Sequence, residues 1–325
     1  MNTRLPLTVL TGFLGSGKTT LVRALLRQPG FQRTAVIINE FGEIGLDHDL
    51  IASSREDLMA LRTGCLCCAM HGELAETVQR LMAVGGFDRL LLETSGLADP
   101  TPILQTAIVD PYLAATVDLT TVVVTVDALH GPPVLQEHDA ARRQVALADR
   151  VLLTKTDLVT DSGAQATQAV RALRPDVLLS PSIHGNVAPH LLFTPAMPST
   201  DWLALLHALP TARHTHDATI TTVSLRLDTP LHAVTLTLFL QALAENCGPD
   251  LLRVKGLVAL RESPETPAVV HGVQHVFYPV TWLDGWPSED HTTRLVLIGR
   301  RFDVEWLALL LHTIEAEVAQ ATSLP

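Results

Sequence analysis

The chain has 325 residues, of which 47% are hydrophobic and 18% charged, a composition typical of globular proteins with room for about two domains. Its formal net charge of −11 argues against nucleic acid and anionic membrane as partners, because both are held by clustered Lys and Arg. No run reaches the roughly 18 apolar residues of a membrane span. No small-residue cleavage site follows the N-terminal apolar stretch, so we expect a cytoplasmic protein.

Short runs rich in Val, Ile and Leu alternate with helical patterns over residues 1–185. The runs are LTVLTG at 7–12, TAVIINE at 34–40, DRLLLETSG at 88–96, LTTVVVTVDAL at 119–129, RVLLTKTDL at 150–158 and DVLLSPS at 176–182. Continuous apolar runs of this kind predict strands buried on both faces of a parallel sheet, with helices on both sides. We therefore expect an α/β domain over 1–185.

Prolines and histidines interrupt this pattern over residues 186–217, which predicts a linker with one short helix. From residue 218 the pattern changes again. ATITTVSLRLD at 218–228 alternates like a half-exposed strand, and LHAVTLTLFLQALAENCG at 231–248 favours a helix that ends at Gly248. Further strand-like runs and a helix from Asp303 follow. We expect a smaller α+β domain over 218–325, with strands covered on one face.

The clearest motif lies where the first predicted strand ends. GFLGSGKTT at 12–20 fits G-x-x-x-x-G-K-[ST] between a strand and a helix, which is a P-loop in its required context. Gly15 and Gly17 let the backbone N–H groups surround phosphates, Lys18 reaches the β- and γ-phosphates, and the Thr19 hydroxyl holds Mg²⁺. The nucleotide-binding candidates here are Gly12, Gly15, Ser16, Gly17, Lys18, Thr19 and Thr20. A glycine turn without a ligand is the alternative interpretation.

The tetrapeptide TKTD at 154–157 addresses the choice of base. The carboxylate of Asp157 can accept hydrogen bonds from guanine N1–H and its 2-amino group, whereas adenine offers no such pair of donors. GTPases usually carry Asn-Lys-x-Asp. Here Thr154, which precedes Lys155, supplies a hydroxyl but no amide. The motif favours GTP over ATP, and a solvated strand end is the alternative.

A second acidic residue follows a buried run in LLLETSG at 90–96. Glu93 has the position of the acidic residue that orients Mg²⁺ or the attacking water, and Gly96 can offer a backbone N–H to the γ-phosphate. We take Lys18 and Glu93 as the catalytic candidates.

Three of the four cysteines, Cys65, Cys67 and Cys68, fall within four residues. They are too close together for a disulfide framework, so metal binding is the favoured interpretation and redox chemistry the alternative. Thiolates favour Zn²⁺ or Cu(I) and can hold Co²⁺, but do not attract Mg²⁺. A fourth ligand is missing. Glu40 and Glu43 in NEFGE are candidates to complete the shell, although a solvated polar loop explains them as well.

These motifs together resemble the CobW-type GTPases, P-loop metal chaperones related to the nickel-insertion GTPases UreG and HypB. The resemblance is carried by TGFLGSGKTTL, IINEFGEIGLD, TGCLCC, LLLETSGLADP and TKTDL, and in the second domain by RVKGLVAL, HGVQHVF and RLVLIG. In that family the Gly-Cys-x-Cys-Cys motif is taken to bind zinc or cobalt. The Asn-Glu-Phe-Gly-Glu stretch is a switch-like loop beside it.

The resemblance implies a metallochaperone that binds and hydrolyses Mg-GTP, slowly without metal or partner. Its metal would be zinc in the first place and cobalt in the second. It would deliver this metal to a client metalloprotein that the second domain helps to choose. Two alternatives remain open: a P-loop ATPase or kinase with a structural zinc site, and a non-enzymatic module that buffers metal or binds protein.

Overall fold

The structure is a computed structural model that describes residues 4–40, 58–62, 70–194, 220–300 and 303–322. The chain divides into two compact units. The first comprises Met1–Ala172 and Val177–Met197, and the second comprises Leu173–Asp176 and Pro198–Pro325. Each unit contains a sheet of its own.

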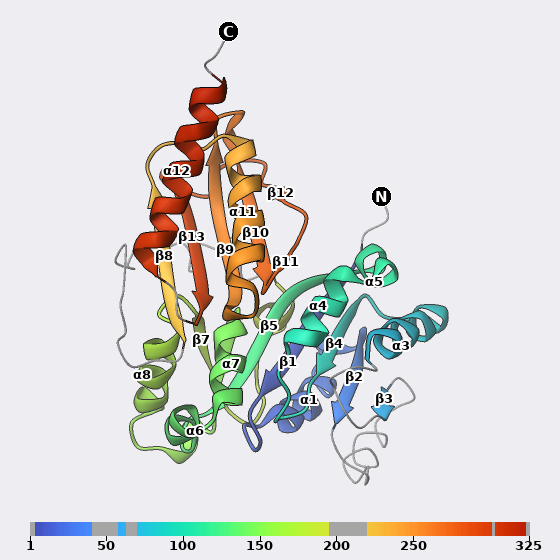
Figure 1. The fold of residues 1–325 in the computed structure, drawn as a ribbon. Coiled ribbons are helices and arrows are strands. Elements are labelled where there is room, and N and C mark those ends of the chain that lie inside the picture. Colours follow the sequence, from blue (N-terminus) through green and yellow to red (C-terminus); the bar gives the residue numbers. More distant parts are fainter. Residues whose placement is uncertain (1–3, 41–57, 63–69, 195–219, 301–302, 323–325) are drawn as a thin grey trace. The chain divides into compact units, whose positions relative to one another are not determined.

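A parallel sheet of seven strands forms the first unit, in the order β3-β2-β4-β1-β5-β6-β7 (Figure 1). The strands are β1 Leu5–Gly12, β2 Thr34–Glu40, β3 Leu58–Arg62, β4 Arg89–Glu93, β5 Val117–Asp127, β6 Arg150–Thr154 and β7 Leu178–Ser182. The apolar runs singled out in the sequence all form strands, and the predicted parallel α/β class is confirmed. The short edge strand β3 was not predicted, because its five residues carry too little pattern.

Helices connect these strands and pack on the sheet (Figure 1). They are α1 Lys18–Leu26, α3 Met70–Val84, α4 Thr101–Val109, α5 Pro111–Thr116, α6 Gly131–Glu137, α7 Asp139–Leu147, α8 Ala164–Leu173 and α9 His190–Phe193, with 3₁₀ turns at Pro29–Phe31 and Thr156–Leu158. Leu10, Leu91 and Val123 from three neighbouring strands form one buried cluster with Leu21 and Leu25 of α1. This apolar layer fixes the first turn of α1 at the carboxyl end of β1.

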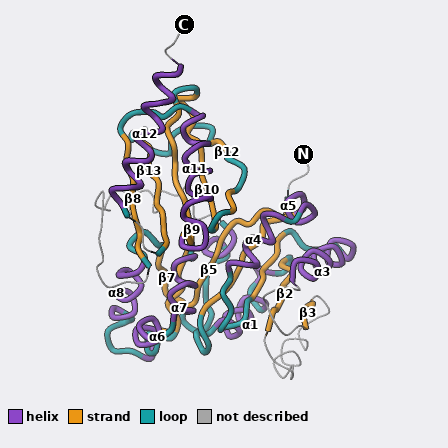
Figure 2. The backbone as a smooth tube through the Cα atoms, in the orientation of Figure 1, coloured by secondary structure: helices purple, strands orange, loops and turns teal. Residues whose placement is uncertain are grey.

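An antiparallel sheet forms the second unit, in the order β11-β10-β9-β13-β8 with β12 paired to β10. The elements are β8 Thr221–Leu227, α11 Ala233–Cys247, a 3₁₀ turn at Gly248–Asp250, β9 Leu251–Leu260, β10 Ser263–Val273, β11 Val276–Phe277, β12 Thr281–Trp282, β13 Thr293–Gly299 and α12 Val304–Thr322. Helices α11 and α12 lie side by side on one face of the sheet (Figures 1 and 2). The predicted smaller α+β unit is confirmed.

The second sheet departs from the expectation that its strands are covered on one face only. Burial alternates along β8, but every position of β9 and β13 is buried. Successive side chains of a strand face opposite sides, so both faces of these two strands are covered. Leu173–Asp176 contributes to the second face, because the Leu173 carbonyl accepts a hydrogen bond from Thr222 Oγ1 at 3.1 Å. In the described part of the chain, no helix combines the length and apolarity that crossing a membrane requires.

Candidate functional site

The loop between β1 and α1 curls through glycines with positive φ. The φ angles are 145° at Gly12, 71° at Gly15 and 94° at Gly17. Residues with a Cβ atom rarely adopt such positive φ angles. A Cβ at Gly12 would also lie 2.5 Å from the carbonyl oxygen of Thr125, so this position needs glycine for space. The Ser16 and Thr125 hydroxyls lie 2.7 Å apart and join the loop to β5. The N-terminus of α1 follows directly, which is the arrangement that binds phosphate.

Lys18 begins α1 and is 8% exposed. Its Nζ donates to the carbonyl oxygens of Gly12 at 2.7 Å and Phe13 at 3.2 Å, so the ammonium group lies along the curled loop. A lysine held there can meet phosphate oxygens with little side-chain movement. Thr20, the last candidate of the motif, is exposed on α1.

Thr19 and Glu93 come together across two elements. Thr19 Oγ1, in the first turn of α1, donates to Glu93 Oε1 at the end of β4 over 3.1 Å, and Glu93 is 5% exposed. A hydroxyl and a carboxylate are the hard oxygen donors that Mg²⁺ prefers. These residues therefore fit the magnesium ion that accompanies a nucleoside triphosphate. They would hold the ion, which neutralises charge on the phosphates when bound.

The end of β6 braces the P-loop from the other side. Thr154 Oγ1 donates to the Ser16 carbonyl at 2.7 Å, and Lys155 Nζ donates to the Gly15 carbonyl at 2.8 Å. Lys155 adopts a left-handed backbone conformation with φ of 57°. This conformation is costly for a residue other than glycine, and it persists only where surrounding contacts hold it in place. Two consecutive residues of TKTD thus hold the phosphate loop.

Asp157, the predicted guanine-binding residue, lies in the 3₁₀ turn after β6. Its side chain is 30% exposed, and His184 Nε2 lies 3.9 Å from its Oδ2. The carboxylate is accessible to the edge of a base. It also stands on the turn that directly follows the two residues bracing the P-loop.

Asp127 at the end of β5 belongs to this site, although sequence reasoning missed it. Its Oδ2 accepts a hydrogen bond from Lys155 Nζ at 2.6 Å, and the same oxygen lies 3.1 Å from His130 Nδ1. Burial raises the pKa of Asp127, but the bonds from Lys155, His130 and the Leu129 backbone N–H outweigh it and hold the pKa below its usual range. An acidic residue ending a buried strand was the signal that could have found it.

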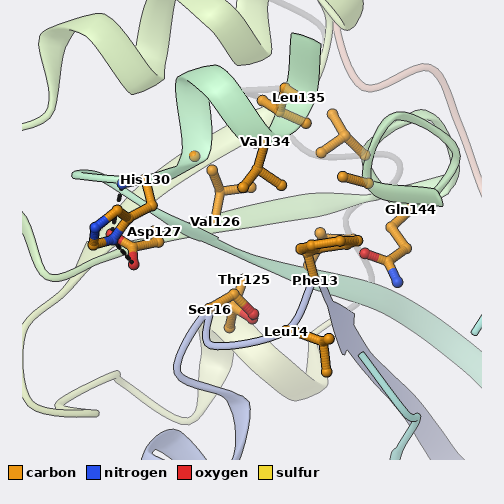
Figure 3. A pocket seen from close by; sticks show the side chains of 14 residues that line it. Phe13, Leu14, Ser16, Thr125, Val126, Asp127, His130, Val134, Leu135 and Gln144 are labelled. Carbon is orange, nitrogen blue, oxygen red and sulfur yellow. Dashed lines mark hydrogen bonds and ion pairs between the residues drawn. The ribbon is translucent and has the colours of Figure 1, made fainter. Parts of the chain in front are cut away.

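Gly96 lies against the P-loop. A Cβ on Gly96 would come within 2.9 Å of the backbone nitrogen of Leu14. A pocket that is partly open to solvent lies beside the P-loop (Figure 3). Its lining includes Phe13, Leu14, Ser16, Thr125, Val126, Asp127, His130, Val134, Leu135 and Gln144. The carboxyl ends of β1, β4, β5 and β6 therefore carry one continuous site, as expected for ligand binding to a parallel sheet.

The candidate metal ligands lie largely outside the described residues. Cys65, Cys67, Cys68 and Glu43 fall in undescribed segments, and Glu40 is described only as the last residue of β2. Glu40 pairs with Arg62, the last residue of β3, which precedes Cys65 by three positions in the sequence. Within the described ranges, no three His, Cys, Asp or Glu residues group as a metal site would require.

A curled glycine loop, a lysine in the following helix and a carboxylate at the end of the neighbouring strand define a P-loop nucleotide-binding protein. The chain belongs to the CobW/HypB/UreG family. Residues 6–179 match the family described as CobW/HypB/UreG, nucleotide-binding domain, and residues 220–315 match the Cobalamin synthesis protein cobW C-terminal domain. The resemblance seen in the sequence motifs is thereby confirmed.

Similar proteins cover nearly the whole chain. The zinc chaperone YjiA of Escherichia coli is 32% identical over 90% of this chain and 93% of its own length. The zinc chaperone CobW of Pseudomonas aeruginosa is 34% identical over 95% and 91%, respectively. The crystal structure of the Zn(II)-bound YjiA GTPase is similar with a TM-score of 0.69 at 25% identity, covering 96% of this chain and 99% of that one.

Proposed function

We propose that this protein is a metal-binding GTPase that acts as a metallochaperone. It couples binding and hydrolysis of Mg-GTP to binding of a transition metal and its delivery to a client protein. Zinc is the first candidate, because thiolates bind it well and because the similar proteins are named zinc chaperones. Cobalt is the next candidate, held by the same ligands. The cytoplasm is the proposed location, since thiolate ligands need reduced cysteines.

The proposed coupling between nucleotide and metal is supported by the positions at which two strands end. The paired strands β2 and β3 end at Glu40 and Arg62, at the same edge of the parallel sheet where β1 leads into the P-loop. NEFGE begins with the last two residues of β2, and the cysteine motif follows β3 in the sequence. Both proposed metal-binding stretches thus leave the sheet at its nucleotide-binding edge.

The chemistry assigns separate tasks to the residues of this edge. The P-loop and Lys18 bind the phosphates, Thr19 and Glu93 hold the magnesium ion, and Asp157 selects guanine. Contacts to the γ-phosphate order neighbouring loops, and hydrolysis releases them. A metal site built on such loops differs in affinity between the GTP and GDP states, so hydrolysis becomes the step that permits transfer.

The test is a chelator competition for Zn²⁺ with wild type loaded with a non-hydrolysable GTP analogue or with GDP. A coupling of about 1–3 kcal/mol predicts that zinc binds roughly 5- to 150-fold more tightly in the triphosphate state. Reciprocity requires zinc to tighten the analogue relative to GDP by the same factor. Replacing Cys67 and Cys68 together by Ser is expected to abolish this effect and to leave zinc-free nucleotide affinity unchanged, because serine hydroxyls are poor ligands for soft ions.

Equal zinc affinity in both nucleotide states would remove the chaperone mechanism and leave a GTPase that contains a metal. ATP that displaces bound analogue as well as GTP does would favour an ATPase or kinase with a structural zinc site. Absence of turnover at saturating GTP with zinc, cobalt and candidate clients would favour a metal-buffering module.

A further inference from the structure

Gln144 of α7 connects this helix to the loop that follows β4. Its side chain is fully buried, and its Nε2 donates to the carbonyl oxygens of Gly96 at 3.1 Å and Ala98 at 3.0 Å. Among the described residues, no donor lies within hydrogen-bonding distance of its Oε1. Figure 3 shows this oxygen directed toward Phe13. The reversed amide would place an oxygen against two carbonyl oxygens, so Gln144 must act as a donor to the loop.

The same loop contacts the P-loop on its other side. The Cβ that any other residue would add at Gly96 would lie 2.9 Å from Leu14 N and 2.8 Å from Leu14 Cδ2. Gly96 therefore lies between the backbone of the P-loop and the amide of Gln144. A side chain at this position, or a shift of the loop toward the P-loop, would create a clash.

Neighbouring contacts hold both ends of the loop. At its start, Thr94 Oγ1 donates to Thr11 Oγ1 of β1 at 2.7 Å, directly after Glu93. At its far end, Arg143 Nη1 of α7 donates to Asp99 Oδ2 at 3.0 Å. Arg143 is 34% exposed, so this outer pair is screened by water, whereas the two bonds from Gln144 are fully buried. Gln144 is therefore the stronger connection between α7 and the loop.

We propose that Gln144 is a positioning residue of the nucleotide switch. It holds the main chain of Gly96 against the P-loop, which aligns the loop with the γ-phosphate end of a bound nucleotide, while Gln144 itself does not touch the nucleotide. Movement of Gly96 between nucleotide states must break or re-form two buried hydrogen bonds to α7. This inference rests on the proposed GTPase function, because it assigns the loop to the γ-phosphate.

The test compares Gln144→Met, which keeps the length of the side chain and removes the donor, with Gln144→Leu, which also removes the donor but has a shorter side chain. Displacement of the loop by a fraction of an ångström is expected to lower kcat for GTP on the order of 10- to 100-fold. Affinity for GDP is expected to stay within about twofold of wild type, since GDP has no γ-phosphate. The ratio of GTP-analogue to GDP affinity falls in both variants.

Gln136→Met on the neighbouring helix α6 is the matched control, because Gln136 is an exposed glutamine. It is expected to leave kcat and both affinities unchanged. Unchanged kcat and an unchanged affinity ratio in folded Gln144→Met would overturn the proposal. An equal loss of GTP-analogue and GDP affinity would also overturn it, because that result describes a general role in the fold.

Asp99→Asn provides a second test that does not disturb the buried amide. It breaks the ion pair with Arg143 at the exposed end of the loop, and we expect a smaller change of the affinity ratio in the same direction. If the Gln144 variants do not fold, an unchanged ratio in Asp99→Asn overturns the inference. A wild type that binds GTP without hydrolysing it would contradict the proposed function instead, and the affinity ratio would still decide the role of Gln144.

Discussion

The hydroxyl of Thr19 lies 3.1 Å from a carboxylate oxygen of Glu93, so the first turn of α1 and the end of β4 meet at one point. Glu93 is almost completely buried, and a charged carboxylate in such a place is costly unless hydrogen bonds or a cation compensate it. Magnesium bound to a triphosphate is the cation that this position fits.

Glu93→Gln is expected to weaken the binding of magnesium at this contact. The amide keeps the size of the side chain but removes the negative charge, so the apparent affinity for Mg²⁺ with bound GTP falls by about 10- to 100-fold. A magnesium titration of GTP turnover measures the effect. Glu76→Gln, at an exposed position of α3, is the control and is expected to titrate like wild type. Identical magnesium curves for both variants would contradict the assignment.

Lys18→Ala is expected to remove most of the phosphate affinity. The ammonium group would make charge-assisted hydrogen bonds to phosphate oxygens, and loss of such bonds corresponds to about 10- to 100-fold in affinity. Binding of a fluorescent GTP analogue measures it, with the circular dichroism spectrum and thermal midpoint as checks of the fold. Wild-type affinity in a folded Lys18→Ala protein would refute the P-loop assignment.

The selectivity for guanine over adenine is tested at Asp157, in the turn after β6, and at Thr154, the last residue of β6. Asp157→Asn is expected to lower the preference for GTP over ATP by about tenfold or more, because the amide no longer accepts two hydrogen bonds as a charged partner. Thr154→Val removes only the hydroxyl that holds the Ser16 carbonyl, so it should weaken GTP and ATP to a similar degree. Competition of both nucleotides against a labelled guanine nucleotide gives the two ratios. A wild type without preference for GTP would invalidate the guanine assignment.

The parts of the site that could be predicted from the sequence are those made by local chain geometry. Glycines at fixed spacing between a strand and a helix are typical of a P-loop, so Gly12, Gly15 and Gly17 could be proposed without knowledge of the fold. Glu93 was proposed in the same way, because an acidic residue directly follows a buried apolar run. Glu93 lies close to Thr19 because β4 pairs with β1, and β1 leads into the P-loop and α1.

Residues whose role depends on packing between distant elements were missed. Gln144 lies on a short helix and contacts Gly96 and Ala98, which precede it by 48 and 46 positions. Asp127 meets Lys155 only because β5 and β6 are neighbours in register. Nothing in the local sequence pattern distinguishes Gln144 from a solvated glutamine on an exposed helix face. The full burial of β9 was missed for the same reason. Residues 173–176, which belong to the second unit together with β9, come from an earlier part of the chain.

Cys247 is expected to stay outside the metal chemistry. It is buried in the core of the second unit, and burial, with a smaller effect of Asp250, raises the pKa of its thiol. A raised pKa lowers the thiolate fraction at neutral pH and slows alkylation. Cys247→Ala should therefore leave the zinc stoichiometry and the number of thiols that react in the native protein unchanged. Loss of bound zinc in this variant would show that the fourth cysteine takes part.

The last prediction concerns the partly buried pair of Asp127 and Lys155, in which Lys155 Nζ donates to Asp127 Oδ2 over 2.6 Å. Asp127→Asn removes the charge that holds Lys155 against the Gly15 carbonyl. We expect a loss of about 1–3 kcal/mol in the free energy of unfolding and weaker GTP binding, because the brace of the P-loop loosens. Urea unfolding and nucleotide titration measure the two effects. Asp118→Asn is the control, since the pair of Asp118 with Arg4 is half-exposed and contributes little.

The direction of the pKa shift of Asp127 determines how this loss depends on pH. Its pKa is lower in the folded protein than in the unfolded chain, so the unfolded chain binds more protons between the two values. The stabilisation is fully present above the ordinary carboxyl pKa of about 3.9, and it disappears as the pH falls through the lower folded value. The difference in unfolding free energy between wild type and Asp127→Asn should therefore be constant from neutral pH down to about pH 5 and shrink below about pH 4. A difference that instead grows as the pH falls would mean that the carboxylate destabilises the fold, and the proposed brace between β5, β6 and the P-loop would be wrong.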